Sequence, residues 1–330
     1  MFDGFARVWS PVTLAKNVRK KPTGVLFAGE KIVFFRDDQG KPHALMDRCP
    51  HRGVKLSLGR VTEKGCLECP FHAWQFDGTG NTTHIPLNPD AKLENYSAMA
   101  LTVREIGNLL WVYSDVARSA APPEPTIPDA LTNDTLAFTY LQVEWKAHWT
   151  RAMENMLDSP HVPFLHATTI GRFVRPHLKP NSRMNVEWTD TEFGGETHSN
   201  IDGSHDSGAK LQFFKPNMMV LHIPVPKQIF RMHSFCIPID HERVRMIVVG
   251  ARSFARFSLL NYYFNHSNAK IAEQDRVVVE SSDPVIIPPP GHEQSVRTDK
   301  ATLRFRKYYF DELAKSSVDT SKRRLDVIKE

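Results

Sequence analysis

Two short segments, each with one cysteine and one histidine, constrain this 330-residue chain more than any other feature of its sequence. They read Cys49-Pro-His51 and Cys69-Pro-Phe-His72. Prolines and glycines around them, such as Gly53, suit tight loops in which backbone amides approach a bound group closely. The pattern predicts two loops that meet at one metal centre and each contribute one sulfur and one nitrogen ligand.

The mixed composition of each pair favours iron and sulfur over zinc. A Rieske [2Fe–2S] cluster needs two thiolates on one iron and two imidazoles on the other, which follows directly if each loop gives one ligand to each iron. A Cys₂His₂ zinc site usually places like ligands together, as C-x₂₋₄-C and H-x₃₋₅-H. Cys66 forms a CxxC pair with Cys69, but that pairing leaves both histidines unexplained. We expect Cys66 to be an ordinary strand residue and Cys236 to be a core residue.

The rest of the sequence predicts two domains. Short β-like runs separated by turn signals such as DDQG and DGTG indicate a small antiparallel β domain over residues 1–118. Residues 119–128 contain four prolines and are expected to form a linker. Residues 129–330 combine a long strand series with helical segments around 147–158, 268–282 and 299–314. This grouping predicts an α+β domain with a large antiparallel sheet flanked by helices.

A second group of candidate ligands lies at residues 154–166. A helix running to Asp158 places Asn155 and Asp158 on one face. Pro160 should end that helix, so His161 lies at its C-terminal end and His166 beyond it. On its own such a histidine pair is more often part of a satisfied structure than a metal site. Downstream of the first motif it favours a 2-His-1-carboxylate centre, which leaves positions on Fe(II) open for O₂.

Both motifs, in this order and with a proline-rich junction between them, resemble the Rieske non-haem iron oxygenases, also called ring-hydroxylating oxygenase α subunits. The length is similar to that of the compact branch with vanillate and dicamba O-demethylases. The resemblance implies a helix-grip-like catalytic domain after the Rieske domain. It also implies two cofactors, a [2Fe–2S] Rieske cluster and a mononuclear Fe(II), with O₂ as co-substrate.

The resemblance also assigns roles to single residues. It implies that Cys49, His51, Cys69 and His72 hold the cluster, and that His161 and His166 bind the mononuclear iron. It makes Asp158 the carboxylate that links the iron site to a Rieske histidine of a neighbouring subunit, and Asn155 a polar residue close to the iron. The third iron ligand is expected on a late helix, where Asp275 matches. Asp283 competes, but it precedes a proline and is expected past the helix end.

The expected reaction needs partners. The resemblance implies that a separate NAD(P)H-dependent reductase, a ferredoxin, or both supply the electrons. No G-x-G-x-x-G follows a strand, so this chain is not expected to take hydride from a nucleotide itself. The resemblance implies a homotrimer. Residues 1–64 hold roughly twice as many basic as acidic residues, which indicates either a solvated face or a docking surface for an acidic partner.

The substrate is expected to be a small organic molecule, with aromatic compounds among the candidates. Methionines and aromatics of the late strands, and His233 as a polar contact, are candidate pocket residues, although core packing explains any one of them equally well. We expect hydroxylation or oxidative demethylation by a monooxygenase. A cis-dihydroxylating arene dioxygenase, a Rieske electron carrier and a zinc-binding structural protein are the alternatives, in that order.

Composition narrows the class further. Hydrophobic residues make up 41% of the chain and charged residues 24%, as in globular proteins. The net charge of +5 does not indicate nucleic-acid binding. No signal peptide or membrane span is recognisable, so a cytoplasmic protein without membrane contact is expected.

Overall fold

The computed structural model describes residues 1–2, 4–115, 121–203 and 210–315. It divides into two compact units, Met1–Pro125 and Thr126–Lys315. The expected boundary between the first domain and the linker falls within residues 116–120, and the expected catalytic domain ends within 316–330. Both lie outside the described residues, so the predicted bounds of 1–118, 119–128 and 129–330 remain predictions.

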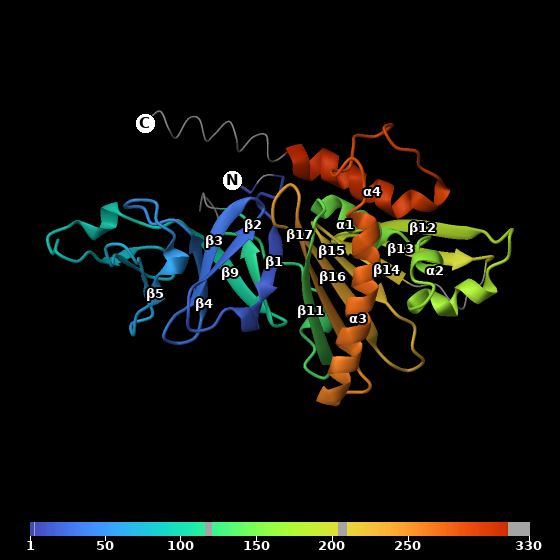
Figure 1. Cartoon of the computed structure of the whole chain (residues 1–330), viewed down its shortest axis with the longest axis horizontal. Helices are drawn as coiled ribbons and strands as arrows, with labels where there is room; N and C mark the ends of the chain where they lie inside the picture. The colour runs from blue at the N-terminus through green and yellow to red at the C-terminus, as the bar shows by residue number, and fades with distance from the viewer. Residues whose placement is uncertain (3, 116–120, 204–209, 316–330) are drawn as a thin grey trace. The chain divides into compact units, whose positions relative to one another are not determined.

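The N-terminal unit contains two antiparallel sheets (Figure 1). The larger has the strand order β1-β10-β9-β4-β3-β2 and the smaller β5-β6-β7-β8. The strands are β1 (Trp9–Leu14), β2 (Thr23–Phe27), β3 (Glu30–Arg36), β4 (Pro42–Met46), β5 (Arg60–Val61), β6 (Leu67–Glu68), β7 (Gln75–Phe76), β8 (Thr82–His84), β9 (Ala100–Ile106) and β10 (Leu109–Tyr113). Single 3-10 turns occur at Ala15–Asn17, Leu56–Leu58 and Leu93–Asn95.

One hydrophobic core connects the two sheets of this unit. Val33 and Leu45 pair across β3 and β4 and pack with Leu67 of the smaller sheet. Cys49 and Cys69 belong to the same buried cluster. The two cysteines are therefore held by the core itself, although they lie in loops.

The C-terminal unit is built on one seven-stranded antiparallel sheet with the order β11-β17-β16-β15-β14-β13-β12. The strands are β11 (Ala137–Trp145), β12 (Met184–Thr191), β13 (Gly194–Ile201), β14 (Lys210–Phe214), β15 (Met218–His222), β16 (Phe230–Pro238) and β17 (Val244–Arg252). The helices are α1 (Trp149–Leu157), α2 (Val162–Leu165), α3 (Ser258–Val279) and α4 (Lys300–Tyr308), with short turns at Asp129–Leu131, Ile170–Phe173, Arg175–His177, Arg297–Asp299 and Tyr309–Leu313. The predicted α+β fold, an antiparallel β domain followed by a large sheet with helices, is confirmed.

Contacts of the strands with the helices identify which sheet face the helices cover. Figure 1 shows α3 lying along the sheet. Arg252 of β17 donates to Asn261 of α3 and lies over the ring of Phe264. Phe213 of β14 packs edge-on against Phe305 of α4. Side chains that share this face by register therefore face the helices, and their strand neighbours face away.

Helix α3 begins ten residues before the predicted start at 268. The missed segment, SLLNYYFNHS, is rich in asparagine and aromatic residues, which are weak helix formers. Tertiary contacts compensate, because Asn261 and Phe264 are engaged by Arg252. None of the described helices is long and apolar enough to cross a membrane.

Candidate metal centres

The two Cys-His loops have matching backbone geometry. Cys49 N–H donates to the carbonyl of Val54, and Cys69 N–H donates to the carbonyl of Trp74, both at 2.8 Å. The carbonyls of the same two cysteines accept hydrogen bonds: Gly53 N–H donates to Cys49 at 2.9 Å, and Ala73 N–H donates to Cys69 at 3.1 Å.

Gly53 and Ala73, the two donors to the cysteine carbonyls, both have positive φ, 72° and 53° respectively. Glycine accepts that conformation freely, whereas alanine adopts it at some cost. The two segments therefore form the same turn twice and present their cysteines in equivalent positions.

The side chains of these loops fit a Rieske cluster. Cys49 and Cys69 are each 2% exposed, whereas His72 lies at the surface. The rings of His51 and His72 lie 4.7 Å apart, and His51 stacks on Trp74 at 4.6 Å with 3° between the planes.

Two features of this site call for a bound group. The buried Nδ1 of His51 has no hydrogen-bond partner among the described residues. Burial, partly offset by backbone amides of His51 and Arg52, raises the pKa of the Cys49 thiol to about 11. A buried thiol with a raised pKa is protonated at neutral pH, and coordination to a metal converts it to the thiolate.

The second centre draws its residues from three helices. Helix α1 ends at Leu157, and Asp158 leaves it in extended conformation. His161 precedes α2 and His166 follows it. Asp275 lies on α3, more than a hundred residues later, and is 3% exposed.

The ligand atoms of His161, His166 and Asp275 lie within 4.8 Å of one another. Asp275 Oδ1 is 3.1 Å from His166 Nε2 and 3.7 Å from His161 Nε2. That buried oxygen forms no hydrogen bond within the described residues, so an unpaired carboxylate oxygen faces two imidazole nitrogens. Burial alone would lower the pKa of His166, but the Asp275 carboxylate and the Gln274 amide raise it above its usual value. Two imidazoles and one carboxylate are the donor set of a facial triad.

Each histidine of this centre is oriented through its Nδ1. Asp158 Oδ2 lies 2.9 Å from His161 Nδ1 and also accepts from the His161 backbone amide at 3.0 Å. Gln274 Oε1 lies 3.0 Å from His166 Nδ1. Both rings therefore keep Nε2 free on the side of Asp275. Gln274 was not predicted from the sequence, where its signal is its position next to Asp275.

The other predicted site residues lie as follows. Asn155 is on α1, one turn before Asp158, and its buried Nδ2 has no partner among the described residues. Asp283 is exposed beyond the end of α3 and is not part of the three-residue group. His233 is fully buried on β16, and Nδ1 contacts the carbonyl of Val249 at 3.2 Å.

Met232, the residue before His233 on β16, pairs with Gly250 and lies on the same sheet face as Arg252, which contacts α3. Because successive residues of a strand point to opposite faces, His233 faces away from the helices that carry the iron-site candidates. Its suggested role in binding substrate stays a prediction that this placement does not support. Among the other pocket candidates, Phe213, Met219, Phe230 and Met232 share the helix-covered face, and Phe214, Met218 and Phe235 occupy the opposite one.

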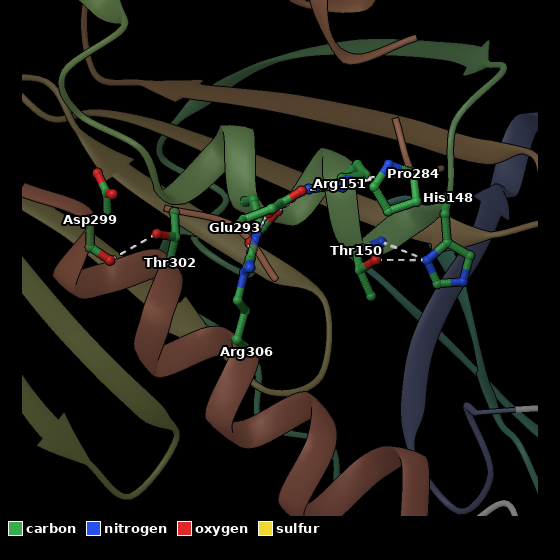
Figure 2. Close-up of polar contacts among 9 residues, drawn as sticks. His148, Thr150, Arg151, Pro284, Glu293, Asp299, Thr302 and Arg306 are labelled. Atoms are coloured by element: carbon green, nitrogen blue, oxygen red, sulfur yellow. Dashed lines mark hydrogen bonds and ion pairs between the residues drawn. The ribbon is translucent and has the colours of Figure 1, made fainter. Parts of the chain in front are cut away.

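A network of two arginines and two glutamates connects α1 with α4 and with the segment between α3 and α4, as Figure 2 shows for Arg151, Glu293 and Arg306. Arg151 of α1 donates to Glu293 at 2.7 Å and to the carbonyl of Pro284 at 2.7 Å. Arg306 of α4 donates to Glu293 and to Glu154 of α1. The arginines hold the pKa of Glu293 at about 2. The network fixes α1, and with it the position of Asp158. Its members are scattered in sequence and carry no motif.

Comparison with known families agrees with both sites. Residues 8–97 match the Rieske [2Fe-2S] domain family, and residues 145–315 match the family described as vanillate O-demethylase oxygenase C-terminal domain. The second match alone covers more than half of the chain. This chain belongs to the Rieske non-haem iron oxygenases. This Rieske oxygenase has the two cofactors of the family, a [2Fe–2S] cluster and a mononuclear iron. The predicted family and cofactors are confirmed, and the assignment of individual ligands remains a prediction.

Curated relatives of this Rieske oxygenase include pheophorbide a oxygenase of Oryza sativa subsp. japonica, 27% identical over 304 residues, which are 84% of this chain and 57% of the relative. The 4beta-methylsterol monooxygenase of Methylococcus capsulatus is 38% identical over 168 residues, 50% of this chain and 43% of the relative. The chain thus spans about half the length of the curated relatives it matches.

Solved structures also resemble this Rieske oxygenase. Dicamba monooxygenase bound to dicamba superposes with a TM-score of 0.79 at 19% identity, covering 95% of this chain and 98% of the other. That likeness concerns the fold alone. NdmB of Pseudomonas putida CBB5 also has a TM-score of 0.79, at 25% identity, covering 95% and 92%.

Proposed function

We propose that this chain is the terminal oxygenase of a multicomponent system, and that it hydroxylates or oxidatively demethylates a small organic substrate. The observation that carries the proposal is the convergence of His161, His166 and Asp275 in a chain that also holds a Rieske site. When bound, the mononuclear iron supplies O₂ activation and the cluster supplies electrons. These three residues would hold the iron, and a 2-His-1-carboxylate donor set would leave coordination positions for O₂ and substrate.

The geometry of both centres supports the proposed assignment of ligands. Cys49 and Cys69 would hold the buried iron of the cluster, and His51 and His72 the iron nearer the surface. Asp275, rather than Asp283, would complete the mononuclear site, because its free oxygen faces both histidines. Asn155 would lie beside this site, one helical turn from Asp158.

Electrons are proposed to come from a separate NAD(P)H-dependent reductase, directly or through a ferredoxin. The chain has no nucleotide-binding fingerprint of its own. The basic residues of the first 64 positions would favour an acidic donor, and Lys16, Arg19 and Lys20 form an exposed group among them.

A homotrimer is proposed, in which the Rieske site of one chain lies beside the iron of the next. The exposed His72 is flanked by Phe71, which is 60% exposed. The segment around His161 and His166 exposes Phe164 at 67% and Phe173 at 66%. Exposed apolar residues beside both centres suit contacts between chains. Asp158 Oδ1 forms no hydrogen bond among the described residues, so it is available to the N–H of a neighbouring chain's His72.

The substrate is proposed to be a largely apolar ring compound. Met219 and Met232 lie on the helix-covered sheet face, and methionine adapts to varied apolar surfaces. The names of relatives include pheophorbide a, a methylsterol and 3-chlorobenzoate, which are ring compounds with different substituents. Relatives are named both as monooxygenases and as dioxygenases, so cis-dihydroxylation is the second candidate outcome.

A substrate screen with a surrogate reductase tests this function. O₂ uptake and hydrogen peroxide are followed together for a panel of apolar ring compounds, because a true substrate converts O₂ to product without releasing peroxide. Isotope-labelled O₂ then distinguishes the outcomes, since hydroxylation leaves one labelled atom in the product, demethylation leaves it in the released formaldehyde, and a dioxygenase leaves two in the product. Reduction of the cluster without O₂ consumption by any compound, in protein that contains the mononuclear iron, would contradict the oxygenase role.

A further inference from the structure

Gln274 contacts three polar groups of the segment that follows α2. Its Oε1 lies 3.0 Å from His166 Nδ1 and accepts from the Thr169 hydroxyl at 2.8 Å. Its Nε2 donates to the Thr168 hydroxyl at 3.3 Å. The amide is therefore used on both sides, with its oxygen facing His166 Nδ1 and Thr169 and its nitrogen facing Thr168.

This contact defines the tautomer of His166. An amide oxygen can only accept, so the proton of the neutral imidazole must be on Nδ1. The lone pair of Nε2 then points toward Asp275, whose Oδ1 is 3.1 Å away. A metal ligand needs this arrangement, with one ring nitrogen donating to a fixed acceptor and the other nitrogen free.

Gln274 and Asp275 are consecutive residues of α3, about 100° apart around the helix. Asp275 Oδ1 lies beside the Nε2 atoms of His161 and His166, whereas Gln274 reaches Nδ1 on the other side of the His166 ring. One turn of α3 thus supplies a candidate ligand and the support of a second ligand. His161 differs, because its Nδ1 faces the charged carboxylate of Asp158 instead of a neutral amide.

We propose that Gln274 is a positioning residue for the mononuclear iron, which holds His166 in the tautomer that binds metal and does so without adding a charge. The inference rests on the proposed function of His161, His166 and Asp275 as the metal site. It gives the two histidines different roles: His161 is coupled to the charged Asp158, and His166 is held by a neutral anchor.

The test measures metal affinity in Gln274→Leu, Gln274→Glu and a control, Glu273→Gln. Leucine keeps a good helix former but removes the acceptor, whereas glutamate keeps the acceptor. Glu273 is a neighbour on the same helix whose side chain is 59% exposed and pairs with Arg276. Protein depleted of mononuclear iron and retaining its cluster is titrated with Co²⁺ or Fe²⁺, with the cluster spectrum as the measure of intact protein.

We expect Gln274→Leu to weaken metal binding by roughly 10–100-fold. Gln274→Glu should bind at least as tightly as the wild type, because a carboxylate also accepts from Nδ1. Glu273→Gln should be unchanged. The unfolding temperatures of the metal-depleted variants separate positioning from a general loss of stability. If Gln274 acts by positioning, Gln274→Glu should restore the metal affinity whether or not its unfolding temperature differs from that of Gln274→Leu.

Wild-type affinity in Gln274→Leu would overturn the positioning role and leave the proposed function intact. Equal weakening in Gln274→Leu and Gln274→Glu would also overturn it, because then the acceptor is not what matters. If instead the wild type binds no metal that depends on His161 and Asp275, the proposed function itself fails, and this inference fails with it.

Discussion

The carboxylate of Asp158 accepts from His161 twice, from the backbone amide at 3.0 Å and from ring Nδ1 at 2.9 Å, through the same oxygen. One oxygen thus fixes both the start of α2 and the orientation of the ring. The second oxygen forms no hydrogen bond within the described residues. This arrangement suits a residue that supports a ligand within its own chain and contacts another chain.

Asp158→Asn should separate these two roles. The amide oxygen can still accept from His161, so both metals should stay bound and the cluster should still be reduced at a near-normal rate. Product formation in a single turnover should fall by more than about 100-fold, because loss of the second contact adds to the usual cost of losing such a support. Normal turnover with full metal content would disprove the bridging role. Loss of the mononuclear iron would instead make Asp158 essential for binding it.

Asp275→Ala and Asp283→Ala distinguish the two candidate carboxylates. Asp275 is buried beside both histidines, whereas Asp283 is exposed. We expect Asp275→Ala to lose the mononuclear iron and all activity with the Rieske spectrum unchanged, and Asp283→Ala to resemble the wild type. Iron analysis and the cluster spectrum of both proteins provide the measurement. The reverse pattern would show that the assignment is wrong.

Glu293→Gln should remove a pH-dependent contribution of the ion pairs around α1 to the stability of the protein. The Arg151 and Arg306 partners lower the folded-state pKa of Glu293 from 4.5 to about 2, so its stabilisation is complete above pH 4.5 and is lost as the pH falls toward 2. Chemical denaturation should show Glu293→Gln as less stable than the wild type at pH 7. The difference should shrink as the pH falls below 4.5. A difference in stability that does not change with pH would contradict the ionic origin.

Turnover with an acidic electron donor should depend on salt. Exposed charges are screened over about 8 Å at physiological ionic strength, so the apparent KM for the donor should rise with added salt. Lys16→Gln, Arg19→Gln and Lys20→Gln together should raise that KM and reduce its salt dependence. A KM for the donor that changes neither with salt nor with the triple substitution would argue against docking at this basic surface.

The fold class and the candidate site residues could be predicted from the sequence because they depend on local patterns. The Cys-x-His and Cys-x₂-His loops and the sequence from Asn155 to His166 carry fixed ligand spacings. The three-dimensional neighbours of His166 do not. Gln274 is 108 positions away, and only the packing of α3 brings it there.

Register also limited the prediction of pocket residues. Met232 and His233 are adjacent in sequence, yet they lie on opposite faces of the sheet. Hydrophobicity could not tell the two faces apart, since both are buried near the centre of this sheet. The start of α3 was missed for a related reason, because tertiary contacts there outweigh weak helix propensity.

The assignment of two iron centres to this chain is tested most directly by iron content together with the Rieske electron paramagnetic resonance signal, in the wild type, Cys69→Ala and His161→Ala. We expect about three iron atoms per wild-type chain, two in the cluster and one at the mononuclear site. His161→Ala should retain the full Rieske signal and about two irons, and Cys69→Ala should lose the signal. A wild-type protein with only the cluster irons, or a colourless protein with stoichiometric zinc, would contradict the assignment of two iron centres to this chain.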